Sequence, residues 1–75
     1  MKFDYGTEII VNESAPPKYK PGNIGWVVGY REIKSIEMSN VFNQDIGCGI
    51  YTIEFEDDPD GIDIPEPYLL SHSSA

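Results

Sequence analysis

The densest group of chemically active side chains is a run of carboxylates near the C-terminal end of the sequence. Seven acidic residues fall between positions 54 and 66, with no basic residue among them. Repulsion between so many like charges is a cost that a small domain must offset. The run predicts an anionic docking surface for a basic partner, and the alternative is a solvated hairpin face. The acids are Glu54, Glu56, Asp57, Asp58, Asp60, Asp63 and Glu66.

The same carboxylates could in principle bind calcium. Glu56, Asp58, Asp60 and Gly61 match the first, third, fifth and sixth positions of an EF-hand loop. The first position should be Asp, the twelfth falls on Pro67 instead of a bidentate Glu, and the pattern predicts no flanking helices. The sequence also has no Cys/His cluster with ligand spacing. We predict no metal site and no cofactor.

Cys48 and His72 are the residues that could suggest nucleophilic catalysis. Such a pair must be held within hydrogen-bond reach and oriented by a third group, and neither residue has an obvious partner in the sequence. A short barrel also offers little concave volume in which to bury a substrate. We expect no catalytic residues and no enzyme activity.

Aromatic rings could add contacts to an acidic docking surface. Tyr19 and Phe42 fall in predicted loops, so they are expected to be exposed, whereas a 75-residue chain needs its other rings in the core. The predicted partner-binding residues are therefore Glu54, Glu56, Asp57, Asp58, Asp60, Asp63, Tyr19 and Phe42.

Alternating apolar positions predict short strands that position these residues. Residues 3–12 and 50–56 alternate apolar and polar side chains, and 25–33 is rich in aromatic and β-branched residues. Gly25 and Gly29 are expected where the middle strand bends or approaches another backbone closely. Three prolines make residues 13–22 a stiff loop.

The remaining segments are connections and a short last strand. Residues 34–49 are expected to be an extended connection because Ser, Asn and Gly interrupt a weak helical pattern. Residues 57–61 predict a type I turn with Pro59 and Gly61, after which 62–64 pairs back. Residues 65–70 predict a 3-10 turn.

Together these elements predict an all-β protein, a small SH3-like five-stranded barrel with a short C-terminal 3-10 turn. The length leaves room for one domain, expected over 1–70, followed by a flexible tail over 71–75.

Charge and composition restrict the partners. Thirteen acids against five bases give a net charge of −8, which opposes binding to nucleic acid and anionic lipid. No apolar run approaches the roughly 20 residues that span a bilayer. The single cysteine and an N-terminus without a long apolar run favour a cytoplasmic location.

Three stretches of the sequence also carry a family likeness. They are Phe3-Asp4-Tyr5-Gly6, Lys20-Pro21-Gly22 with residues 25–29, and residues 51–57 with Ile64-Pro65-Glu66 and Leu69. Over about residues 3 to 70 the chain resembles the bacterial polymorphic-toxin immunity family called immunity protein 31. It departs from that pattern at Pro59, which interrupts the Asp-Gly turn of the hairpin.

The resemblance implies a cytoplasmic all-β protein that binds a cognate toxin and neutralises it, with no catalytic residues. It assigns no individual binding residue. Many toxin domains are basic, which agrees with an acidic inhibitor. The alternatives are a general SH3-like interaction module and a phage-type acidic inhibitor that mimics nucleic acid.

Overall fold

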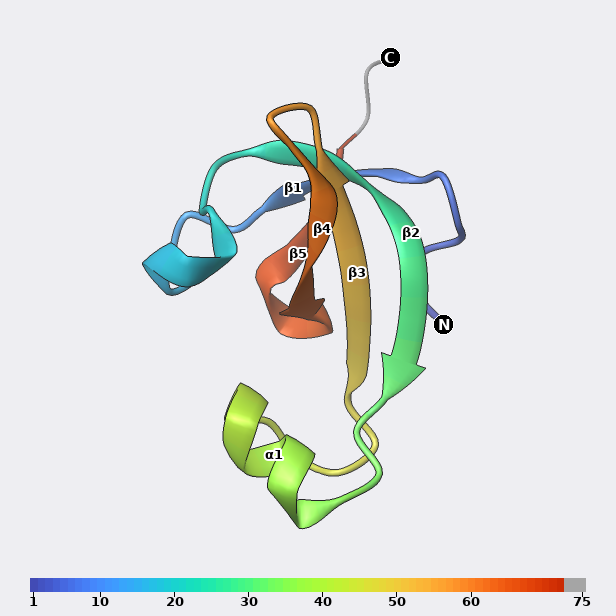
Figure 1. Ribbon diagram of the computed structural model, residues 1–75, viewed down its shortest axis with the longest axis vertical. Helices are drawn as coiled ribbons and strands as arrows, with labels where there is room; N and C mark the ends of the chain where they lie inside the picture. The colour runs from blue at the N-terminus through green and yellow to red at the C-terminus, as the bar shows by residue number, and fades with distance from the viewer. Residues whose placement is uncertain (73–75) are drawn as a thin grey trace.

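The computed structural model describes residues 1–72 and arranges their five antiparallel strands in one sheet (Figure 1). The strand order is β4-β3-β2-β1-β5, so each strand of the meander β1 to β4 lies beside its neighbour in sequence. The elements are β1 (Glu8–Val11), η1 (Pro17–Tyr19), β2 (Ile24–Glu32), α1 (Ile36–Phe42), β3 (Gly49–Phe55), β4 (Asp58–Pro65), η2 (Glu66–Tyr68) and β5 (Leu69–Ser71).

The expectation of an all-β fold is confirmed by this arrangement. β4 and β5 form the two edges of the sheet, and they do not pair with each other within residues 1–72. The sheet is therefore open and is not closed by hydrogen bonds into a barrel.

β2 is long and curved, and it pairs with β1 at its start and with β3 along most of its length (Figure 1). A Cβ atom placed on Gly25 would lie 2.6 Å from the Glu54 carbonyl oxygen and 2.7 Å from a methyl carbon of Ile53. The pairing register shifts between Val27 and Gly29, which marks a β-bulge. The close approach and the bending expected at these glycines are confirmed.

The core lies on the inner face of the sheet, where alternating residues of each strand meet. Tyr51, Ile53 and Phe55 of β3 are buried, as the alternation in that strand predicted. Phe3 packs edge-on against Tyr51 with ring centroids 5.4 Å apart. The cluster comprises Phe3, Ile9, Val11, Ala15, Tyr19, Val27, Tyr51, Ile53, Phe55, Ile64 and Leu69.

The first strand is shorter than residues 3–12. Regular pairing begins at Glu8, because Gly6 adopts φ +82° and turns the chain. Phe3 still reaches the core, whereas Tyr5 is exposed.

The hairpin between β3 and β4 differs from its prediction. Its turn consists of Glu56 and Asp57, since Phe55 pairs directly with Asp58. The predicted turn over 57–61 is therefore wrong. Pro59 and Gly61 lie within β4, where an edge strand tolerates the missing proline N–H and a bulge uses φ +82° at Gly61.

The prediction of an extended connection over 34–49 is also wrong. Ser35 caps α1 by accepting a hydrogen bond from the Met38 N–H at 3.2 Å, and Asn43 ends the helix with φ 53°. Local capping thus stabilises seven helical residues, none of them buried. No helix among residues 1–72 is long and apolar enough to cross a membrane.

The C-terminal 3-10 turn is confirmed as η2, and Leu69 directly after it is buried. Ser71 ends β5, and the His72 N–H donates to the Glu8 carbonyl oxygen at 3.2 Å. Of the predicted tail, Ser71 thus belongs to the sheet and His72 is hydrogen-bonded to it, and the rest of the tail, 73–75, lies outside the described residues.

Candidate protein-binding face

The acidic hairpin is an exposed projection at the end of the sheet opposite α1 (Figure 1). Glu54 stands near the end of β3, Glu56 and Asp57 form the turn, and β4 contributes the next two acids, Asp58 and Asp60. We refer to these five residues as the hairpin acids. The structure brings together five of the six acids predicted to bind a partner.

Lys20 partly neutralises the hairpin acids. Its Nζ lies 3.2 Å from Asp57 Oδ1 and 3.8 Å from Asp58 Oδ2, and it also lies 5.2 Å from the centroid of the Phe55 ring. Within residues 1–72, Glu54, Glu56 and Asp60 form no ion pair. One lysine faces five carboxylates, so the hairpin keeps most of its negative charge.

Asp63 has a different environment from the hairpin acids. Its carboxylate accepts hydrogen bonds from Thr52 Oγ1 at 2.6 Å and from Arg31 Nη2 at 2.7 Å. Thr52 lies on the adjacent strand β3, and Arg31 lies one strand further, on β2, so these contacts cross-link the sheet. Asp63 therefore has its hydrogen-bonding capacity partly used within the fold.

Tyr19 is buried, with 5% of its surface exposed, so its expected exposure is wrong. Pro17 starts the short helix η1, which turns the Tyr19 ring inward against Tyr68 at a centroid distance of 5.6 Å. Phe42 is half-buried at the end of α1, far from the hairpin (Figure 1). Phe42 therefore does not adjoin the hairpin acids, and the buried Tyr19 ring is not available to a partner.

An exposed apolar strip, which was not predicted from the sequence, lies on the outer face of the sheet. Directly paired residues share a face, and Ile10 pairs with both Ile24 and Leu70. Trp26 follows two residues after Ile24 on the same face. Ile24, Trp26 and Leu70 are 45%, 36% and 49% exposed. We call Ile10, Ile24, Trp26 and Leu70 the outer strip.

The signal for the outer strip was present in the sequence but ambiguous. Both faces of β2 carry apolar residues, so periodicity alone could not say which one faces the core. The structure buries Gly25 and Val27, which leaves Trp26 facing outward. Trp26 was expected in the core, and that expectation is wrong.

The outer strip and the hairpin acids are contiguous. A shallow cavity of about 460 Å³ lies where β2 begins and the hairpin turns, lined by Asn23, Ile24, Phe55, Glu56 and Asp57. Trp26 pairs directly with Glu54 on one side and Glu8 on the other. Apolar surface rimmed by carboxylates is suited to a partner with an apolar centre and basic surroundings.

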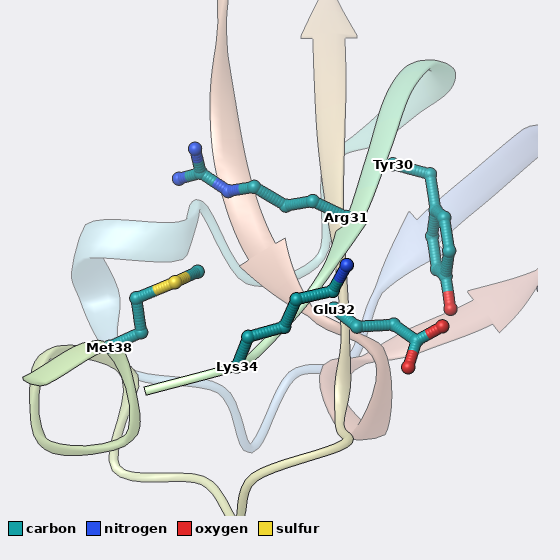
Figure 2. Close-up of a pocket in the computed structure, with 5 residues that line it drawn as sticks. All are labelled: Tyr30, Arg31, Glu32, Lys34 and Met38. Atoms are coloured by element: carbon teal, nitrogen blue, oxygen red, sulfur yellow. The ribbon is translucent and has the colours of Figure 1, made fainter. Parts of the chain in front are cut away.

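A second cavity of about 460 Å³ lies between the end of β2 and α1. Figure 2 shows Tyr30 and Glu32 on one side of the strand, Arg31 and Met38 on the other, and Lys34 between them. The charges of this cavity are mixed, and its Arg31 already pairs with Asp63. It offers no charge complementarity to a particular ligand.

The remaining reactive groups lie apart from one another. His72 Nε2 lies 3.3 Å from Glu8 Oε1, whereas Cys48 is hydrogen-bonded to the Gly49 carbonyl oxygen. Burial raises the pKa of the Cys48 thiol, with a further rise from the carboxylates of Glu66 and Asp45. A protonated thiol is a poor nucleophile. Within residues 1–72, no three His, Cys, Asp or Glu side chains form a group that could hold a metal ion.

Comparison with known proteins assigns the chain to no family. No protein-family model, no curated protein and no solved structure matches the chain. The outer strip and the hairpin acids are thus the features from which function has to be inferred.

Proposed function

We propose that this chain is an immunity-type inhibitor, which binds a basic bacterial toxin in a stoichiometric complex and covers its working surface. The observation that carries the proposal is the union of five hairpin acids, which have Lys20 as their internal counterion, with an exposed apolar strip that adjoins three of them, Glu54, Glu56 and Asp57. The resemblance to immunity protein 31 supplies the class of partner, and the inhibitor would act in the cytoplasm.

The two parts of the face would contribute differently to binding. Carboxylates raise the rate of encounter with a basic partner and disfavour wrong partners. Buried apolar and aromatic contacts supply most of the affinity in typical interfaces. A standard interface takes about 800 Å² from each protein, roughly a sixth of the 4663 Å² surface of this chain. One face of a small domain is therefore sufficient.

We further propose that the fold is an SH3-like barrel in which the two edge strands, β4 and β5, are not hydrogen-bonded to each other. The order β4-β3-β2-β1-β5, with a 3-10 turn between β4 and β5, supports this description. The strongly curved β2 would let one strand serve both halves of such a barrel (Figure 1).

Co-expression with the protein encoded by the adjacent gene tests the proposal. We expect the toxic effect of that protein on growth to be lost, and the two purified proteins to form a 1:1 complex by light scattering. Continued killing and the absence of a complex would contradict an immunity role. A housekeeping partner that binds at the Tyr30 cavity would instead favour the general interaction module.

A further inference from the structure

Trp26 lies at the centre of a cross-strand row on the outer face of the sheet. It pairs with Glu8 on β1 and with Glu54 on β3, and both carboxylates share its face. Directly opposite residues have Cβ atoms about 5 Å apart, so both acids border the indole ring. A contact between His72 and Glu8 helps to hold one of them, with Nε2 and Oε1 3.3 Å apart.

A second cross-strand row extends this face with apolar side chains. Leu70, Ile10 and Ile24 stand opposite one another on β5, β1 and β2. A chain of 75 residues has few apolar residues to leave outside its core. Contiguous exposed apolar surface on a small protein marks an interaction site.

We propose that this surface binds a basic segment of the partner protein, with a guanidinium or ammonium group over Trp26 between Glu8 and Glu54. Apolar residues of the segment would pack on Ile10, Ile24 and Leu70. The inference rests on the proposed function and locates its energetic centre at Trp26, flanked by Glu8 and Glu54. The other four hairpin acids, Glu56, Asp57, Asp58 and Asp60, would serve mainly for steering.

The charges favour this occupant over a second copy of the chain. Each copy carries a net charge of −8, and a two-fold contact through the outer strip would bring its own carboxylates together. A cation over an indole ring is attracted by the ring face, and flanking carboxylates strengthen its binding. Arginine fits best because its planar group both stacks and forms paired hydrogen bonds.

A synthetic peptide that alternates arginine and leucine tests the inference without the toxin. Trp26 is the single tryptophan, so its fluorescence reports directly on the outer strip. We expect titration with the peptide to change the Trp26 fluorescence in a saturable way. This change should be lost when glutamate replaces arginine or serine replaces leucine in the peptide. Calorimetry should show that Trp26→Ala weakens binding about 30-fold or more.

Two further variants distinguish a loss of binding from a loss of folding. The double variant E8Q/E54Q keeps the indole and should weaken binding about tenfold. Val41→Ala, at an exposed apolar residue of α1, should leave affinity unchanged. Equal peptide affinity of the wild type, Trp26→Ala and E8Q/E54Q would overturn the inference. Dimerisation of the wild type that Trp26→Ala abolishes would also overturn it.

The outcomes also separate this inference from the proposed function. Neutralisation of the toxin by Trp26→Ala at wild-type potency would remove the outer strip from the interface and leave the immunity role intact. Peptide binding with the expected variant pattern, together with a toxin that is not neutralised, would remove the immunity role and retain the site.

Discussion

Tyr51→Phe is expected to lower the free energy of unfolding by about 2–4 kcal/mol. The phenolic oxygen accepts hydrogen bonds from the backbone N–H groups of Lys2 and Phe3 at 2.6 and 3.1 Å, and it donates to Glu66 Oε1 at 2.9 Å. Loss of the hydroxyl would leave these groups without that partner while the ring stays buried. Urea unfolding monitored by Trp26 fluorescence measures the change.

Tyr5→Phe is the matched control for this prediction. Tyr5 is 65% exposed, and no hydrogen bond of its hydroxyl is found within residues 1–72, so its loss should cost under about 0.5 kcal/mol. Equal stability of the two variants would show that the Tyr51 hydroxyl does not fasten the N-terminal segment to the core.

The same hydroxyl should make the free energy of unfolding fall at alkaline pH. Burial raises the pKa of Tyr51 above the ordinary value of 10.0, so the folded state retains a proton that the unfolded state releases. Its contribution to stability is therefore complete below pH 10 and is lost as the pH rises through the folded-state pKa. The fall in stability above pH 10 should be less steep in Tyr51→Phe.

Gly25→Ala is expected to destabilise the fold by about 3 kcal/mol, at the upper end of overpacking effects. The new methyl group would meet a carbonyl oxygen of β3 at 2.6 Å, and a backbone atom inside a sheet cannot move aside alone. The chain would have to separate β2 from β3 where Gly25 pairs with Phe55. Thermal and urea unfolding measure the loss.

Gly29→Ala provides the comparison on the same strand. The nearest atoms to its new methyl group belong to the Thr52 side chain, at 3.0 and 3.1 Å, and a side chain can shift by a few tenths of an ångström. We expect about 1 kcal/mol of destabilisation. A Gly25→Ala variant as stable as Gly29→Ala would mean that the close strand approach is not a constraint on this fold.

The parts of the fold that sequence predicted well are those with one unambiguous pattern. From Tyr51 to Phe55, β3 alternates buried and less buried residues, and its assignment was confirmed. β2 carries apolar residues on both faces, so the side on which Trp26 lies could not be read from periodicity. The strand itself was predicted, but the outer strip was not.

The hairpin and α1 were missed for local reasons. Pro59 and Gly61 have the composition of a turn, yet they form a bulged edge strand because Phe55 pairs with Asp58. α1 depends on local caps, Ser35 at its start and Asn43 at its end, in a segment whose Ser, Asn and Gly residues are equally typical of loops.

The candidate site was predicted in part. Charge density alone located the hairpin acids, because carboxylates without nearby bases cannot easily be buried. It could not show that Asp63 is tied to Thr52 and Arg31 on other strands. Nor could it place the loop residue Tyr19 in the core, since that depends on the path of the chain after Pro17.

The association rate of the chain with the proposed toxin partner, measured as a function of salt, tests the binding role of the acidic hairpin most directly. The variant D57N/D58N/D60N, which removes three of the negative charges of the hairpin, should associate more slowly than wild type at low salt and lose most of its salt dependence. The control E32Q/E37Q/D45N removes the same number of charges at the α1 end of the sheet, opposite the hairpin, and should retain most of that dependence. Stopped-flow traces that are the same for wild type and the hairpin variant at every salt concentration would contradict binding through the acidic face.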